Sequence, residues 1–326
     1  MGLPESHRRR FGPLPFWRVE QRDRPAGELH RRFPPVVGHP RARPIDLRLA
    51  WGRPMPEGPE VRRMAHRLAR VLVDQRLGEL DLPHPALRPH EHRLSRHRIT
   101  AVETRGKAFL IRFGKKGTIY VHLQLYGRWK IHRVSTEPRS NRTLRAAFVT
   151  ETHQALLYSA TDLEVLSDAG IENHRFLSRL GPDLFDPNLT DESLAERLTG
   201  PTFGRRQLAG LLLDQGFMGG IGNYLRAEML YVAGVAPHRK GSSLHIDEAL
   251  ALANAIRTIG QRAYDQKGYT TDDELLAVAK RRQWSKRRVR HYVFEREGQA
   301  CFACGTGIQR ADIGGRRMFW CASCQT

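Results

Sequence analysis

Four cysteines near the end of the 326-residue chain constrain its fold more than any other feature. They form two pairs with two residues inside each pair and sixteen residues between the pairs. This is the spacing of a zinc ribbon, in which each pair folds a tight knuckle and four thiolates complete a closed tetrahedral site. No ligand position stays open, so the metal is expected to be structural. The predicted ligands of one Zn²⁺ are Cys301, Cys304, Cys321 and Cys324.

The cysteines and the charge also indicate a compartment and a kind of partner. A secreted disulfide scaffold would spread its cysteines along the chain, so their clustering favours the reduced cytoplasm. The formal net charge of +20 predicts a polyanionic partner. A membrane surface is the alternative anion. However, no run approaches the roughly 18 apolar residues of a transmembrane helix, and no signal peptide is evident.

Residues 1–54 differ in composition from the rest of the chain. They hold nine of the nineteen prolines and twelve arginines but no lysine, and they lack hydrophobic periodicity. We therefore predict an unstructured arm. It is either a genuine basic tail or an upstream reading frame wrongly joined to a true start at Met55. We favour the second origin, because GC-rich noncoding DNA would give this composition.

The segment 55–182 reads as one helix followed by short strands. Pro59 and Glu60 suit a first helical turn, because proline has a fixed φ and the acid lies near the positive helix end. Apolar residues then recur at helical spacing as far as Leu72. This order predicts a β-sandwich or flattened barrel. The predicted strands are 99–104, 107–113, 118–123, 128–133, 144–150 and 155–159.

Two features of this first domain have both a structural and a functional interpretation. Lys107 begins a strand directly after a glycine, where a lysine is commonly just a solubilising charge. Gln124, Leu125 and Tyr126 form a tip after a strand. Such a tip is either an ordinary loop or a wedge that enters a base stack where a nucleotide has left.

Helical periodicity replaces the strand pattern over 183–295. Four glycines within 216–222 directly precede a predicted helix from Tyr224 to about Val232. Glycines allow a close backbone approach, either to a phosphate at the helix N-terminus or to a neighbouring segment in a tight corner. We favour the phosphate, with Asn223 as a further donor.

Two basic stretches lie towards the end of the chain. Residues 280–290 contain seven lysines and arginines around Trp284, and they form either a solvated surface or a groove that follows a sugar–phosphate backbone. In the cysteine module, 296–326, Arg316 follows two glycines near the expected hairpin turn. This position would let its guanidinium reach phosphates.

The hexapeptide Met55–Glu60 reads like the start of a protein. If the chain began after Met55, Pro56 would carry a free secondary amine, which is a nucleophile for carbonyl-type carbons. The neighbouring Glu57 would be placed to transfer protons. Taken alone, the same residues are a common turn into a helix.

Together, these motifs resemble the bacterial formamidopyrimidine-DNA glycosylase/endonuclease VIII family of base-excision repair enzymes. The hexapeptide, Arg105–Lys107, the stretch 212–224 and the cysteine module occur in the family's order and approximate spacing. The hexapeptide and the tip at 124–126 are more similar to endonuclease VIII than to the formamidopyrimidine branch. The resemblance implies an α+β fold with an N-terminal β-sandwich, a helix-two-turn-helix domain and a zinc-ribbon hairpin.

The resemblance also implies a chemistry. Pro56 would attack C1′ of a damaged nucleoside and form a Schiff base, and Glu57 would act as acid and base at the deoxyribose. Lys107 would bind a phosphate beside the lesion and assist proton transfer, and β,δ-elimination would cleave the strand. The other implied residues are the supporting acids Glu60 and Glu228, the phosphate contacts Asn223 and Arg316, and the wedge Gln124, Leu125 and Tyr126.

The implied function is a bifunctional glycosylase and AP lyase for oxidised pyrimidines, acting as a cytoplasmic monomer on damaged double-stranded DNA without a required protein partner. One alternative is an enzyme for 8-oxoguanine and formamidopyrimidines. Another is a noncatalytic zinc-dependent DNA-binding protein, if Pro56 stays in a peptide bond. The chain departs from the family pattern in its extension and over 266–292. Because Arg317 follows Arg316, either could contact phosphate.

Overall fold

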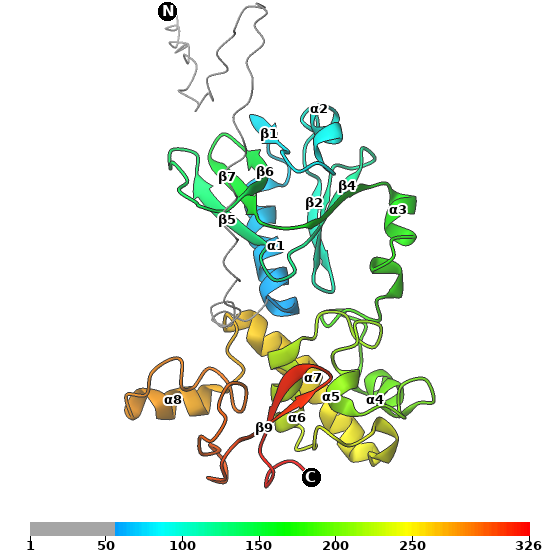
Figure 1. Ribbon diagram of the computed structural model, residues 1–326, viewed down its shortest axis with the longest axis vertical. Coiled ribbons are helices and arrows are strands. Elements are labelled where there is room, and N and C mark those ends of the chain that lie inside the picture. The colour runs from blue at the N-terminus through cyan, green and yellow to red at the C-terminus, as the bar shows by residue number, and fades with distance from the viewer. Residues whose placement is uncertain (1–55) are drawn as a thin grey trace, which may run out of the picture. The chain divides into compact units, whose positions relative to one another are not determined.

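The computed structural model describes residues 56–326. The predicted arm, residues 1–54, lies outside these described residues. The described chain folds into a β-sandwich with one long helix, α1, followed by a helical part and a terminal β-hairpin (Figure 1). This confirms the predicted α+β fold.

Helix α1 (Gly58–Leu72) is amphipathic and links the sandwich to the helical part. Its buried residues Val61, Ala65, Leu68 and Leu72 recur every three to four positions, which places them on one face. This face contributes to the core between the sheets. The helix contacts strands β2, β3 and β7, and it also contacts helix α7 of the helical part.

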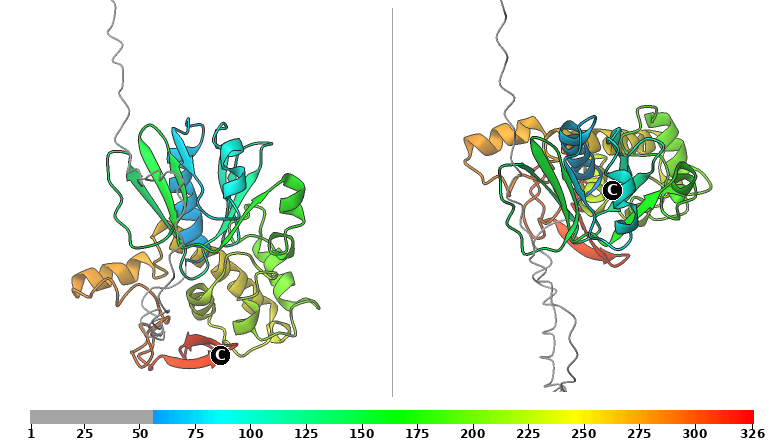
Figure 2. Two further views of the ribbon diagram at one scale, coloured as in Figure 1. Left: turned by 45° about the horizontal axis from the view of Figure 1, so that its top comes forward. Right: turned by 90° about the horizontal axis from the view of Figure 1, so that it is seen from above.

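Two four-stranded antiparallel sheets face each other across a shared core (Figure 2). The sandwich, rather than a continuous barrel, is therefore the correct alternative. The sequence patterns did not predict the edge strands β1 and β8. In spatial order, one sheet holds β1 (Glu79–Asp81), β6 (Leu144–Val149), β7 (His153–Tyr158) and β5 (Arg128–Arg133), and the other holds β2 (Ala101–Arg105), β3 (Ala108–Arg112), β4 (Thr118–His122) and β8 (Asp162–Leu166).

Strands β3 and β4 are buried on both faces. Phe109 and Ile111 point into the core between the sheets. Ala108, Leu110 and Tyr120 pack on the opposite side, against the segment of α3 (Asp168–Glu172) and η3 (Leu177–Arg179). Burial on both faces explains why these strands are almost continuously apolar instead of alternating.

The helical part and the terminal hairpin share one hydrophobic core. Met318 and Phe319 of the hairpin are buried in the same cluster as Leu225 and Leu230. No helix in the described part of the chain has the length and apolarity needed to cross a membrane. The elements of the helical part and hairpin are α4 (Asp191–Thr199), α5 (Leu208–Leu211), α6 (Asn223–Val232), η4 (Gly241–Ser243), α7 (Ile246–Asp265), α8 (Asp273–Arg281), β9 (Gln309–Ile313) and β10 (Arg316–Trp320). The short helices η2 (Arg88–His90) and α2 (Glu91–Leu94) belong to the β-sandwich, between β1 and β2.

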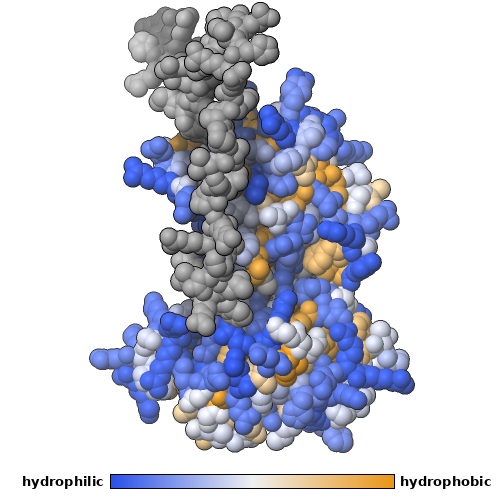
Figure 3. Space-filling view, viewed as in Figure 1, coloured by the Kyte–Doolittle hydropathy of each residue, from blue (hydrophilic) through white to orange (hydrophobic). Residues whose placement is uncertain are grey.

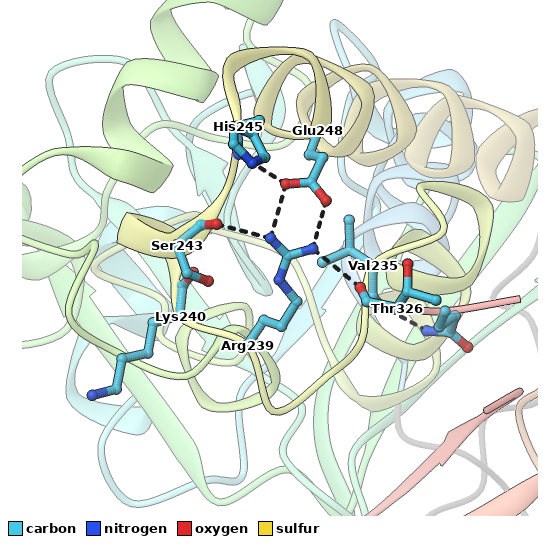
Figure 4. A network of polar contacts seen from close by, with 8 residues as sticks. Val235, Arg239, Lys240, Ser243, His245, Glu248 and Thr326 are labelled. Carbon is cyan, nitrogen blue, oxygen red and sulfur yellow. Dashed lines mark hydrogen bonds and ion pairs between the residues drawn. The ribbon is translucent and has the colours of Figure 1, made fainter. Parts of the chain in front are cut away.

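Arg239 joins two segments of the helical part to the last residue of the cysteine module (Figure 4). Its guanidinium forms a bidentate pair with Glu248 near the start of α7, at 2.5 and 2.8 Å. It also donates to the carbonyl oxygens of Ser243 at 2.8 Å and Thr326 at 3.1 Å. The hydrogen bond from Arg239 lowers the pKa of Glu248 from its ordinary value of 4.5 to about 2.

We expect Arg239→Ala to lower the free energy of unfolding at pH 7 by about 1–3 kcal/mol, because charge-assisted hydrogen bonds are lost. A carboxylate whose pKa is lower in the folded state than in the unfolded state stabilises the fold at a pH above its unfolded-state pKa. This stabilisation is lost as the pH falls and the carboxylate is protonated. The difference between the wild type and the variant should therefore shrink as the pH falls from 4.5 towards 2. Urea denaturation across this pH range measures it, and a constant difference would contradict the assignment. Arg257→Ala, which removes the ion pair of a more exposed arginine with Asp191, is the control.

Candidate active site at the junction of α1, α6 and the β2–β3 turn

The Glu57 carboxylate lies at the N-terminus of helix α6. Its Oε1 accepts a hydrogen bond from the N–H of Tyr224 at 2.9 Å, and its Oε2 accepts one from the N–H of Leu225 at 3.2 Å. The first N–H groups of a helix have no partner inside the helix, and its dipole favours a negative charge there. The anion at this helix end is therefore a carboxylate of the protein itself, and Glu57 is only 4% exposed.

The glycines before α6 make room for this arrangement. A Cβ atom added at Gly222 would lie 2.2 Å from the Cδ atom of Glu57. The carbonyl of Gly220 accepts a 2.9 Å hydrogen bond from the N–H of Gly58, and a Cβ atom at Gly219 would lie 3.3 Å from the Cα atom of Gly106. These glycines therefore allow segments of the protein itself to approach one another closely in a tight corner. Our preference for a phosphate as the reason for these glycines is wrong.

Glu57 and Lys107 influence each other electrostatically. Burial raises the pKa of Glu57 from 4.5 to about 7, while the charge of Lys107 and the N–H donors of α6 oppose the rise. Burial lowers the pKa of Lys107, the charge of Glu57 opposes this, and Arg316 adds to the lowering. A carboxyl group with this pKa is present in both protonation states near neutral pH, which suits an acid and a base.

Tyr224 forms hydrogen bonds to both Glu57, which precedes α1, and Glu60, which lies in its first turn. Its N–H donates to Glu57, and its hydroxyl donates to Glu60 at 3.0 and 3.1 Å. Glu60 also accepts from the N–H of Glu57 at 3.1 Å, and burial raises its pKa. The fully buried Tyr224 ring lies against His291, with the ring centroids 5.2 Å apart. Sequence reasoning missed Tyr224, because a tyrosine on a helix of this kind also fits an ordinary core position.

Pro56 precedes the buried acid in the chain, and Lys107 acts on it through its charge. Pro56 directly precedes Glu57 and is partly exposed, while Lys107 is half-buried in the turn between β2 and β3. Asp183, which sequence reasoning also missed, holds this turn by accepting from the N–H of Gly106 at 2.7 Å. Gly106 has φ +60°, a conformation that favours glycine. The structure thus brings Glu57 and Lys107 together from positions fifty residues apart.

The predicted wedge projects from the β-sandwich. Leu125 is 66% exposed and Tyr126 is 54% exposed, which is unusual for large apolar side chains. Gln124 has φ +48°, and the N–H of Gly127 donates to the carbonyl of Leu123 at 2.8 Å, so the tip is a tight turn. Its geometry is compatible with insertion between bases, and no contact inside the described protein explains the two exposed side chains.

The predicted phosphate contacts Asn223 and Arg316 have different environments. The Asn223 Nδ2 donates to the carbonyl of Arg317 at 3.0 Å, and its Oδ1 is buried without a hydrogen-bond partner in the described chain. The fully buried Arg226 donates to the carbonyls of Arg316 at 3.2 Å and Arg317 at 3.4 Å. Helix α6 therefore holds the backbone of β10 and leaves the Arg316 side chain exposed.

Glu228 lies apart from the two acids at the start of α1. It is fully buried and accepts four hydrogen bonds: from the Thr270 hydroxyl at 2.6 Å and from the N–H groups of residues 292, 293 and 294 at 2.6, 2.9 and 2.9 Å. Its carboxylate organises the segment that leads into the cysteine hairpin. Its contacts hold this segment of the backbone, and its predicted part as a supporting acid stays a prediction.

The four cysteines form one cluster, with all their sulfur atoms within 4.8 Å of one another. Cys301 and Cys324 lie 3.8 Å apart, and Cys304 and Cys321 lie 3.4 Å apart. The hydroxyl of Tyr231 lies 3.3 Å from the Cys301 sulfur. The sulfur atoms are close enough to bind one metal ion, and a set of four thiolates fits zinc.

Two family descriptions match the chain. The formamidopyrimidine-DNA glycosylase N-terminal domain matches residues 55–162, and the formamidopyrimidine-DNA glycosylase H2TH domain matches residues 180–274. Endonuclease 8 of Escherichia coli (strain K12 / DH10B) is 40% identical over 271 residues, which are 83% of this chain and 100% of that protein. Endonuclease 8 of Escherichia coli O7:K1 (strain IAI39 / ExPEC) is 39% identical over the same shares.

Solved structures share the fold at lower sequence identity. A complex between Lactococcus lactis Fpg and DNA containing an abasic site has a TM-score of 0.69 and 21% identity, covering 83% of this chain and 99% of that chain. MutM in complex with DNA containing carbocyclic 8-oxo-G has a TM-score of 0.68 and 20% identity, covering 83% and 100%. The fold and the family matches define a DNA glycosylase of base-excision repair. The chain belongs to the formamidopyrimidine-DNA glycosylase/endonuclease VIII family, as its motifs predicted.

We expect Gly222→Ala to lower the free energy of unfolding by about 1–3 kcal/mol, because its methyl group would overlap the Glu57 carboxylate. Urea denaturation measures this change. Gly210→Ala in α5 is the matched control, since its methyl group would meet nothing within 4 Å. The control should be neutral or stabilise by up to about 1 kcal/mol through helix propensity. Equal stability of both variants would show that Glu57 does not lie beside Gly222.

Proposed function

We propose that this protein is a bifunctional DNA glycosylase and AP lyase that removes oxidised pyrimidines from double-stranded DNA. The observation that carries the proposal is the buried Glu57 carboxyl, which directly follows Pro56, has a pKa of about 7 and interacts with the charge of Lys107. The 40% identity to proteins named endonuclease 8 favours oxidised pyrimidines as the lesion class. The likeness to 8-oxo-G complexes, at 20% identity, supports the fold alone.

The chemistry requires a free secondary amine at Pro56. The neutral amine attacks C1′, a C–N bond forms, and the damaged base leaves with the electron pair of the glycosidic bond. An α-amino group has a pKa of roughly 8, so an appreciable fraction is neutral at pH 7, and the nearby cation Lys107 increases that fraction. After the amine loses its proton, its lone pair forms the Schiff base as the C1′–O4′ bond breaks.

Glu57 and Lys107 manage the protons of these steps. The protonated Glu57 carboxyl donates to O4′ as the sugar ring opens, and its conjugate base is then available for proton removal. Lys107 pairs with the phosphate beside the lesion and assists proton transfer. Loss of a C2′ proton with cleavage of the C3′–O bond is the β-elimination, and a second elimination releases the other phosphate.

The remaining predicted residues bind the DNA or hold the fold. Leu125 and Tyr126 fill the space left by the extrahelical nucleotide, and this offsets part of a flipping cost of a few kcal/mol. Arg316 contacts backbone phosphates through its exposed side chain. Zn²⁺ on the four cysteines cross-links the hairpin and takes no part in the reaction. Domains at 55–182, 183–295 and 296–326 accord with these separate tasks.

Borohydride trapping tests the proposal. Protein that begins at Pro56 should form a covalent adduct with duplex DNA containing thymine glycol or dihydrouracil, because the reduced Schiff base is stable. The matched control has one alanine before Pro56, which converts the amine into an amide and should abolish the adduct. An adduct with 8-oxoguanine DNA alone would reassign the lesion class. DNA binding without any adduct from the Pro56 protein would identify a noncatalytic DNA-binding protein.

The pH dependence of the reaction should reflect Glu57. Its protonated form is the proposed acid while the Pro56 amine must be neutral, so kcat/KM should level off between about pH 7 and the amine pKa of roughly 8 and fall tenfold per pH unit above both. The charge of Lys107 lowers the Glu57 pKa, so Lys107→Met should move this alkaline limb to higher pH besides slowing cleavage. Single-turnover cleavage from pH 6 to pH 9 measures both effects. If the alkaline limb of the Lys107→Met variant lay at the same pH as that of the wild type, the charge interaction between Glu57 and Lys107 would be contradicted.

A further inference from the structure

A basic surface beside α8 is not used by the proposed mechanism. Six of the nine residues from 280 to 288 are cationic, none is acidic, and all six basic side chains are exposed. Figure 3 shows the surface over α8, at the lower left, as mostly hydrophilic. We call this group the α8 patch; its members are Lys280, Arg281, Arg282, Lys286, Arg287 and Arg288.

The charges of the α8 patch are not neutralised by the described protein. None of the six side chains forms an ion pair within residues 56–326. Asp272, Asp273 and Glu274 lie at the opposite end of α8, one helix length away. Lys280 and Arg281 complement the negative helix end, but residues 286–288 lie beyond the helix and cannot be explained in this way.

Helix α8 is also lightly packed. Only Ala279 of its nine residues is buried, and the helix projects from the helical part in Figures 1 and 2. A helix that buries so little gains little stability from packing. Six like charges at the C-terminal end of α8 and in the segment that follows it repel one another. A polyanionic ligand would compensate both costs.

One aromatic stack fixes the patch to the cysteine hairpin. The Trp284 ring is stacked on Phe302, with the centroids 5.8 Å apart. The Arg288 guanidinium lies 4.2 Å from the Trp284 centroid, and Arg296 lies 3.5 Å from the Phe302 centroid. Phe302 lies between Cys301 and Cys304, so the fold of the cysteine knuckle positions the patch. The hairpin carries Arg316, and the patch and Arg316 therefore belong to one supported module.

We propose that the α8 patch binds the phosphodiester backbone of duplex DNA outside the lesion contacts and extends the DNA footprint. The inference rests on the proposed function only in taking duplex DNA as the ligand. Duplex DNA presents one negative charge per roughly 1.7 Å of axis, so a row of cations can meet several phosphates. Trp284 is a positioning residue, which holds the cations through its stack on Phe302.

The test is the salt dependence of binding to an undamaged 30-base-pair duplex, measured from 50 to 300 mM KCl. The triple variant Lys280→Gln, Lys286→Gln and Arg287→Gln leaves the arginines around Trp284 in place. Its slope of log Kobs against log[salt] should be smaller by roughly 2–3, since each phosphate contact on B-DNA contributes about 0.9. The matched control, Arg76→Gln, Lys115→Gln and Lys116→Gln, removes three exposed charges elsewhere and should change the slope by less than about 1.

Trp284 provides a second measurement. Trp284→Leu should reproduce part of the slope loss with the cations intact, whereas Trp284→Phe should retain the wild-type slope because the stack is kept. Equal slopes for the wild type and the triple variant would overturn the proposal, as would an equal loss in the control. If the triple variant lost binding only to single-stranded RNA or to anionic vesicles, the proposal of a duplex DNA ligand would be overturned in favour of that ligand. Borohydride trapping is scored separately, so failure of the lyase leaves this result interpretable.

Discussion

The structure of the candidate site depends on one interaction, the capping of helix α6 by the Glu57 carboxylate. Two hydrogen bonds to the N–H groups of Tyr224 and Leu225 join residues 167 and 168 positions apart in the sequence. The positive end of α6 makes burial of this acid possible, because it replaces part of the lost hydration. Burial in turn brings the pKa of Glu57 to about 7.

The surrounding residues are arranged to permit that contact. Gly222 leaves the space that the Glu57 side chain occupies, and Gly58 hydrogen-bonds the carbonyl of Gly220. Asp183 holds the turn that carries Lys107 by accepting from the N–H of Gly106. The β-sandwich and the helical part thus meet at this site through close backbone contacts and through hydrogen bonds from backbone N–H groups to carboxylates. A methyl group at position 222 would occupy the space of the Glu57 carboxyl.

Local patterns predicted the elements well and the contacts between them poorly. The strand and helix periods identified α1, β2 to β7 and α6, because these segments bury one or both faces at regular spacing. The same reasoning assigned the glycines before α6 to a phosphate, since it could not identify which group approaches them. It could not identify the partners of Glu228, which are the Thr270 hydroxyl and the backbone N–H groups of 292–294.

The sequence by itself determined the cysteine cluster, the order of the elements and the Pro56–Glu57 pair, because metal-ligand spacing, periodicity and chain neighbours are local properties. Only the tertiary structure decided the pKa of Glu57, the bridging position of Tyr224 and the support of Lys107 by Asp183. These depend on burial and on contacts between distant segments. Such properties arise when the chain packs, and no short stretch of residues contains them.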